Sequence, residues 1–230
     1  MAAQLLVQDK SIVIPGEMLA EGMDYLPGYG TYRKGDTILS SQLGLVSLKD
    51  RFVKVIALTG KYVAREDDLV IGSVYDITMH GWLVNINAPY TAALMLREVP
   101  EYVERGADLT RYYGFGDLIA AKVVKVIKGK GIDLSLKGPG LRKLQNGRVI
   151  DVTPSKVPRI IGKQGSMISL IKEKTGCMIV VGQNGKVWIQ GKSTEDEVKA
   201  SEAILKIEHE SHTDGLTEKI GALLDGDGKK

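Results

Sequence analysis

The turn Gly162-Lys163-Gln164-Gly165 is the stretch of this 230-residue chain whose residue types could do the most specific chemistry. Glycine has no Cβ atom, so a sugar-phosphate chain could approach the backbone closely at Gly162 and Gly165. Amides at the start of a helix after the turn would point at a phosphate, whose negative charge the helix dipole favours. Lys163 adds a mobile cation. The turn is therefore a candidate phosphate-binding loop.

Two helical segments are expected to position this turn. The upstream helix can begin at Ser155, and Pro158 is tolerated in its first turn because the amides there lack intrahelical partners. The downstream segment has its apolar residues near helical spacing. It places Lys172 and Lys174 just before Gly176, a composition typical of a helix end.

Strand candidates flank the two helices at residues 147–152, 177–181 and 186–190, and Asn184-Gly185 predicts a hairpin between the last two. A final helix is predicted to open with a capping box of Thr194 and Glu197. This order resembles the type I K-homology (KH) domain, whose GXXG loop clamps about four nucleotides of single-stranded RNA or DNA. The resemblance implies that RNA is bound by Arg159, Gly162, Lys163, Gln164, Gly165 and Ser166. A structural turn in an unrelated α/β unit is the alternative.

Residues 69–137 contain five strand candidates with a long third connection, a pattern that fits a small Greek-key barrel. The segment resembles the S1 domain, an OB-fold RNA binder, in Gly72-x-Val74, in the Gly81 turn and in its closing run 132–137. S1 domains stack bases on aromatic residues at the positions of His80 and Leu83, and only His80 could stack here.

Charge is the remaining way in which the barrel could hold RNA. Lys122 and Lys125 are expected to point away from the core by strand alternation, and Lys128 and Lys130 lie on the last hairpin. Together with His80 they are the candidate RNA-binding residues of the barrel. Such a surface would guide a phosphate backbone without reading bases. Ordinary solvated lysines are the alternative.

Residues 1–67 consist of short extended runs and many turns, which predict a small all-β unit. Gly28 and Gly30 lack the third glycine of a dinucleotide site, and Gly162-Lys163 lacks the other residues of a P-loop. The acidic cluster 66–68 is interpreted as a solvated linker. We expect no catalytic residue, no metal site and no cofactor anywhere in the chain. For the N-terminal unit we expect a docking role.

Composition is that of a soluble globular protein, with 43% hydrophobic and 26% charged residues. The single cysteine, Cys177, excludes an internal disulfide and a zinc ribbon. Residues 138–211 carry 12 basic and 8 acidic side chains, a local excess suited to phosphates. No apolar run approaches the roughly 20 residues that span a bilayer, so a cytoplasmic protein without a membrane partner is expected.

The predicted organisation is multidomain, mainly β plus α/β: an N-terminal β docking domain at 1–67, an S1 (OB-fold) five-stranded barrel at 68–138, a type I KH domain at 139–211, and a polar, disordered tail at 212–230. Gly138-Pro139-Gly140 is expected to be a hinge or short linker between barrel and KH domain.

This arrangement resembles the S1/KH RNA-binding cap subunits of the archaeal RNA exosome. The supporting residues are 13–17, 28–32, the run 156–159 before the GXXG loop, and 182–185. The resemblance implies a non-catalytic subunit, present as three copies, alone or mixed with a zinc-ribbon sister subunit, on an RNase PH-like hexameric ring. It would bind single-stranded RNA and guide it to phosphorolytic 3′ to 5′ degradation. A free-standing RNA-binding protein of translation or RNA processing is the alternative. Polynucleotide phosphorylase is excluded because the residues before the barrel are too few for its large catalytic domains.

Overall fold

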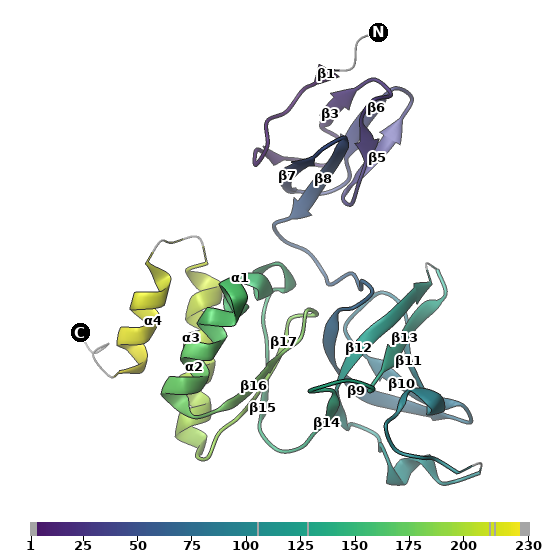
Figure 1. Ribbon diagram of the computed structural model, residues 1–230, viewed down its shortest axis with the longest axis vertical. Helices are drawn as coiled ribbons and strands as arrows, with labels where there is room; N and C mark the ends of the chain where they lie inside the picture. The colour runs from purple at the N-terminus through teal and green to yellow at the C-terminus, as the bar shows by residue number, and fades with distance from the viewer. Residues whose placement is uncertain (1–3, 105, 128, 212, 214, 226–230) are drawn as a thin grey trace. The chain divides into compact units, whose positions relative to one another are not determined.

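The computed structural model describes residues 4–104, 106–127, 129–211, 213 and 215–225. The chain forms two compact units, residues 1–60 and 61–230 (Figure 1). The multidomain, mainly β fold predicted from the sequence is confirmed. Helices occur almost entirely in the last third of the chain, after a succession of strands.

The N-terminal unit is built from two four-stranded sheets. The first has the order β1-β3-β6-β5 and the second the order β2-β7-β8-β4. The strands are β1 (Gln4–Leu5), β2 (Ile12–Val13), β3 (Met18–Glu21), β4 (Leu26–Pro27), β5 (Thr31–Lys34), β6 (Thr37–Ser40), β7 (Gly44–Lys49) and β8 (Phe52–Ala57). Aliphatic side chains from both sheets, among them Leu19, Ile38 and Val46, form one core. The unit therefore has a hydrophobic core of its own.

The second unit begins with the predicted barrel. Its strands are β9 (Leu69–Thr78), β10 (Gly81–Asn85), β11 (Ala92–Met95), β12 (Leu118–Ile127) and β13 (Gly131–Ser135). The barrel closes because β13 pairs in parallel with β11 and antiparallel with β12. The long third connection contains two short 3₁₀ helices, η1 (Leu96–Glu98) and η2 (Leu109–Arg111). It is attached to the barrel where Trp82 Nε1 donates to the Leu109 carbonyl at 3.3 Å.

The first domain boundary lies at Gly60/Lys61, not at residue 67 as predicted. Residues 61–68 belong with the barrel because Tyr62 and Ala64 are buried in its core. The Tyr62 hydroxyl donates to Asp68 at 2.7 Å, and burial together with this carboxylate raises the tyrosine pKa above its usual value. The acidic cluster predicted to be a solvated linker is thus partly structural through Asp68.

The segment at Gly138-Pro139-Gly140 is a turn that returns the chain to the barrel. After it, β14 (Arg142–Leu144) pairs with β12 and extends the barrel sheet. The chain then enters the KH domain, which lies with the barrel in one compact unit. The segment predicted to be a hinge or short linker is therefore a turn within that unit.

The KH domain has the predicted order of elements. Its sheet, in the order β15-β17-β16, is made by β15 (Arg148–Asp151), β16 (Met178–Val181) and β17 (Lys186–Gln190). The helices are α1 (Val157–Ile161), α2 (Ser166–Thr175) and α3 (Thr194–His209), with η3 (Pro154–Lys156) before α1 and η4 (Lys163–Gly165) between α1 and α2. The N-cap of α3 is Ser193, which accepts from the Asp196 amide, so the predicted cap at Thr194 is wrong by one residue.

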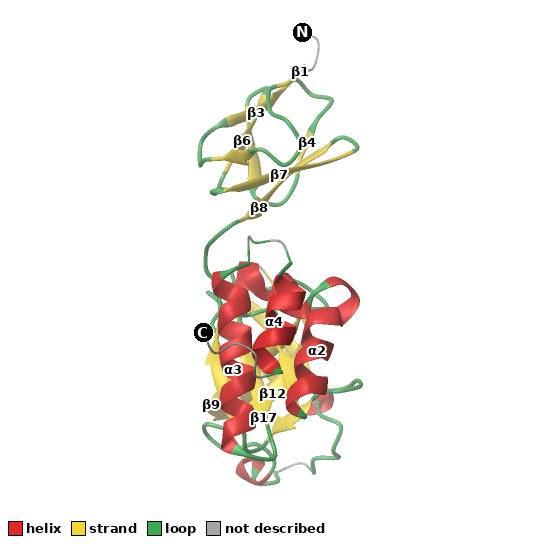
Figure 2. Ribbon diagram, turned by 90° about the vertical axis from the view of Figure 1, so that its left-hand side faces the viewer, coloured by secondary structure: helices red, strands yellow, loops and turns green. Residues whose placement is uncertain are grey.

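The prediction of a disordered tail at 212–230 is wrong for the part that the structure describes. Residues Leu216–Leu224 form a fourth helix, α4, which contacts α2 and α3 (Figure 2). Leu216 and Ile220 are buried in the KH core because they lie four residues apart on one helix face. Residues 212, 214 and 226–230 of the predicted tail lie outside the described residues.

Truncating Ile220 to alanine should lower the free energy of unfolding by about 2–5 kcal/mol, because the side chain is fully buried against the KH core. Thr217→Ala on the exposed face of α4 is the matched control and should change stability by less than about 0.5 kcal/mol. Urea unfolding of the full chain measures both. Equal effects of the two substitutions would contradict the placement of α4 in the core.

Candidate nucleic-acid interface

The GXXG loop joins α1 to α2 through three residues in left-handed backbone conformations. Gly162, Gln164 and Gly165 have φ values of 77°, 54° and 80°. A Cβ atom on Gly162 would lie 2.7 Å from the Met167 Cβ and backbone nitrogen, so only glycine lets the loop pack this closely against α2. A Cβ atom on Gly165 would meet nothing within 4 Å. The outer side of the loop is thus open backbone that a ligand could approach.

The polar side chains of the loop face solvent beside the N-terminus of α2. Lys163, Gln164 and Ser166 are all exposed, and Lys163 forms no ion pair with any residue that the structure describes. No side chain among the described residues caps the N-terminus of α2. The positive end of the helix dipole and the Lys163 ammonium therefore lie beside an open backbone, an arrangement suited to a phosphate.

Arg159 lies on α1, one turn before the loop, and contacts the segment between α3 and α4. Its Nη2 donates to the Thr213 carbonyl at 2.9 Å, and the side chain remains exposed. A neutral carbonyl does not cancel the guanidinium charge, so Arg159 keeps its positive charge. Arg159 is thus attached to the loop through α1, which ends at Ile161.

The barrel lysines are exposed for a reason that alternation does not give. Lys122 and Lys125 are three residues apart, and strict alternation would place them on opposite faces. The register of β12 against β13 shifts between Val123 and Lys125, and this β-bulge lets both lysines face solvent. Lys122 forms a 2.7 Å ion pair with Asp67 at the surface, a contact worth at most about 1 kcal/mol. Lys122 is therefore already paired within the protein.

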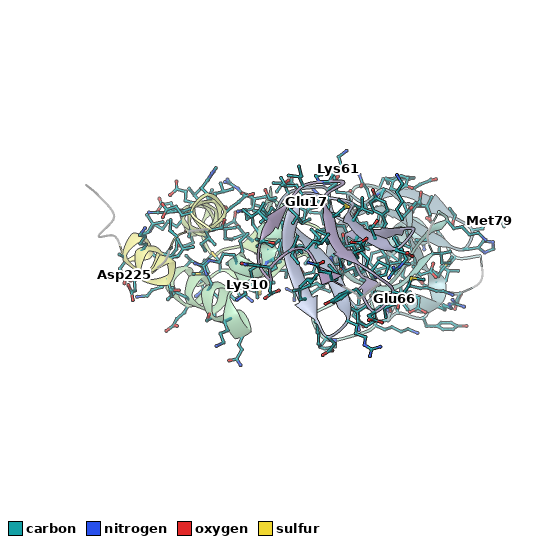
Figure 3. The ribbon with its side chains drawn as sticks, turned by 90° about the horizontal axis from the view of Figure 1, so that it is seen from above. Lys10, Glu17, Lys61, Glu66, Met79 and Asp225 are labelled. Carbon is teal, nitrogen blue, oxygen red and sulfur yellow. The ribbon has the colours of Figure 1, made fainter. Side chains whose placement is uncertain are left out.

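The remaining barrel candidates lie at the ends of hairpins. Lys130 is exposed beside β13, and Lys128 lies outside the described residues. His80 is exposed in the turn between β9 and β10 and lines a shallow depression with Met95, Leu96 and Arg97. Next to it, Met79 is 87% exposed and projects from the barrel (Figure 3). Among the described residues that line the depression, His80 is the only aromatic one. The depression also contains Arg97, which the sequence did not single out.

Asn184 is the residue whose structural role was missed most clearly. It lies in the β16–β17 hairpin predicted from Asn184-Gly185, but its side chain is buried against the barrel. Its Oδ1 accepts from the Ile71 amide at 3.2 Å, and its Nδ2 donates to the carbonyls of Ile71 and Ile86 at 2.7 and 2.9 Å. The adjacent Gln183 amide donates to the Leu69 carbonyl at 2.7 Å. The hairpin thus hydrogen-bonds the KH domain to β9.

An apolar cluster extends this junction. Trp188 of β17 packs with Ile71, Ala120 and Leu144, which come from β9, β12 and β14. All four side chains are buried, and the Trp188 Nε1 is satisfied by the Asn146 carbonyl at 2.8 Å. Barrel and KH domain therefore share a buried interface that combines hydrogen bonds with apolar contact.

The described residues contain no group of three or more His, Cys, Asp or Glu side chains that could hold a metal ion. None of their helices is long and apolar enough to cross a membrane.

Comparison with known proteins gives matches over nearly the whole chain. The KH domain family matches residues 147–206, and the family described as exosome RNA binding protein RRP4 N-terminal domain matches residues 10–59. The exosome complex component Rrp4 of Methanothermobacter thermautotrophicus is 44% identical over 221 residues, which cover 96% of this chain and 70% of the relative. The protein of the same name from Pyrococcus abyssi is 43% identical over 225 residues, covering 96% and 84%.

A crystal structure assigned as an exosome complex RNA-binding protein matches with a TM-score of 0.65 and 32% identity, over 73% of this chain and 97% of that chain. The family matches agree with the two ends of the fold, the N-terminal β unit and the KH domain. With over 40% identity extending across the barrel between them, this chain belongs to the exosome complex component Rrp4 family.

Proposed function

We propose that this protein is a non-catalytic cap subunit of a cytoplasmic exosome that binds single-stranded RNA and guides it to a phosphorolytic RNase PH-like hexameric ring. The single observation that carries the RNA-binding part is the open GXXG loop beside the uncapped N-terminus of α2. Membership of the Rrp4 family supports the assignment to an exosome, in which three copies would cap one ring.

The KH loop is proposed as the main phosphate contact. Backbone amides near Gly162 and Gly165 would hold a phosphate, Lys163 and Arg159 would add charge, and Gln164 and Ser166 would donate or accept hydrogen bonds at its edge. The barrel supports the same strand through Lys125, Lys130 and, after release from Asp67, Lys122. Lys128 and His80 complete the proposed basic surface of the barrel.

Replacing Lys163 and Gln164 together with aspartate should weaken binding of single-stranded RNA strongly, because two negative charges then face the phosphate. Both side chains are exposed, so the fold should persist. Loss of one or two phosphate contacts should also flatten the dependence of log affinity on log salt by about 1–2. Fluorescence anisotropy with a labelled oligouridylate over a salt series measures both quantities.

A matched variant, Lys192→Asp/Ser193→Asp, places the same charges on the exposed turn before α3 and controls for net charge. It should weaken binding far less than the loop variant. Equal losses in the two variants would mean that the GXXG loop makes no specific contact.

The purified protein should not degrade RNA. When it is incubated with 5′-labelled RNA, magnesium and phosphate, the RNA should keep its length. Shortening of the RNA that co-purifies with the protein would contradict a non-catalytic subunit.

A further inference from the structure

A second depression on the barrel surface, of about 270 Å³, carries two tyrosines. Tyr75 comes from β9 and Tyr90 from the loop between β10 and β11, and their side chains are 48% and 38% exposed. Asn85 and Thr91 add polar groups to the wall, and none of the residues that line the depression carries a charge. We call this site the tyrosine pocket. It is separate from the depression around His80, since the two share no residue.

The backbone on both sides of the tyrosine pocket departs from regular strand geometry. The register of β9 against β10 changes from Asp76 opposite Leu83 to Val74 opposite Val84, so Tyr75 is the extra residue of a β-bulge. Bulges redirect side chains and are common beside binding sites. At the end of β10, Asn85 Oδ1 accepts from the amide of Asn87, whose φ of 58° is left-handed. Tyr75 thus lies at a bulge, and Tyr90 follows a turn that begins at Asn85.

One lysine lies on the hairpin that adjoins the tyrosine pocket. The Thr91 carbonyl in its wall accepts from the Ile132 amide at 2.9 Å, where β11 pairs in parallel with β13. Lys130, exposed and two residues before Ile132, therefore lies on the hairpin that adjoins the Tyr90 loop. A neutral aromatic pocket beside a lysine combines the two contacts that single-stranded nucleic acid uses, a base on an aromatic ring and a phosphate on a cation.

We propose that the tyrosine pocket binds one unpaired nucleobase of single-stranded RNA, which stacks on Tyr75 or Tyr90 while the adjoining phosphate contacts Lys130. This inference rests on the proposed RNA-binding function and adds a base-binding site to it. It also gives the barrel an aromatic contact, which Leu83 cannot make. Because stacking accepts every base, the site strengthens binding with little sequence preference.

The test replaces Tyr75 and Tyr90 with alanine, singly and together, in the full chain. Stacking of one base should make the double variant bind a ten-nucleotide oligouridylate roughly 5- to 100-fold more weakly. The salt dependence should not change, since no charge is removed. Tyr75→Phe/Tyr90→Phe keeps both rings and should keep the affinity. Tyr102→Ala, which removes a tyrosine that is 85% exposed outside the pocket, is the matched control and should have no effect.

The outcomes separate this inference from the proposed function. If the wild-type chain binds the oligonucleotide and the Lys163/Gln164 variant weakens it, but the tyrosine variants do not, the tyrosine pocket is not a base site and the proposed function stands. If the wild-type chain does not bind the oligonucleotide, both fall. Unchanged RNA affinity with loss of binding to a purified exosome ring would assign the pocket to a protein partner and overturn the base-binding proposal.

Discussion

Asn184→Ala should lower the free energy of unfolding of the barrel–KH unit by about 3–5 kcal/mol. The substitution leaves three buried backbone groups, the Ile71 amide and the carbonyls of Ile71 and Ile86, without their partner. Each unsatisfied buried group costs about 1–3 kcal/mol, and partial access of water to the gap reduces the sum. Urea unfolding of the full chain, followed by tryptophan fluorescence, measures the loss because Trp188 lies at the same junction.

Two neighbouring substitutions sharpen this test. Asn184→Asp keeps the acceptor for the Ile71 amide but turns the donor into a second acceptor that faces two carbonyls. It should destabilise at least as much as alanine, because a negative charge would be buried and one of its two carboxylate oxygens would face carbonyls in place of a donor. Gln183→Ala is the control: its contact with Leu69 comes from the backbone amide, which alanine retains. A loss for Gln183→Ala equal to that for Asn184→Ala would contradict the role assigned to the Asn184 amide.

The junction also bears on RNA binding. Barrel and KH domain lie in one unit, so an RNA strand that contacts both loses its translational freedom only once. The second contact is then effectively intramolecular. Asn184→Ala should therefore weaken binding of an RNA long enough to reach both modules more than binding of a four-nucleotide RNA that fits the KH loop alone. Equal changes for the two lengths would show that the modules bind independently.

Sequence periodicity predicted the elements well where each segment has one clear period. The two helices around the GXXG loop and the strand at 186–190 were located within two residues, because glycines and apolar spacing mark their ends. Lys122 and Lys125 were predicted to be exposed, and they are, but through a β-bulge that strand alternation cannot show. An inserted residue changes which face every later side chain occupies, and only the pairing partner reveals it.

The features that were missed differ in how much signal the sequence contains for them. Asn184-Gly185 was correctly predicted to be a hairpin, yet nothing local indicates that the amide would reach strand β9 more than 100 residues earlier. Helix α4 was missed because the polar ends of the 212–230 segment dominate its composition. Its signal was present: Leu216, Ile220 and Leu223 recur at helical spacing. Tyr75 had no signal of its own, since it lies in a strand where a tyrosine is ordinary.

Removal of the N-terminal unit should abolish binding to the exosome ring while RNA binding persists. The truncation is best made at Lys61, because a cut at residue 69 would also remove Tyr62 and Ala64 from the barrel core. Residues 61–230 contain the barrel, the KH loop and the junction between them. Size-exclusion chromatography with a purified hexameric ring and anisotropy with labelled RNA measure the two properties on the same sample. Ring binding by the truncated protein would contradict the docking role.

The exposed face of one N-terminal sheet is a candidate surface for the predicted docking. Ile12, Leu45 and Ile56 pair across strands β2, β7 and β8 and so form one apolar row. Ile12 and Ile56 are 65% and 58% exposed, an unusual amount of aliphatic surface for so small a sheet. Since the core of this unit is made by other residues, the row is available to a partner. An apolar surface of this kind fits the core of a protein interface better than an RNA contact.

Ile12→Asp/Ile56→Asp in the full chain should therefore weaken ring binding by at least about 100-fold, because two charges would be buried at the interface without partners. RNA affinity of the free subunit should stay the same, since the substitutions lie outside residues 61–230. Met23→Asp, at a position that is 71% exposed and outside the row, is the matched control and should bind the ring normally. Normal ring binding by the double variant, with loss of binding on truncation at Lys61, would assign docking to another face of the N-terminal unit.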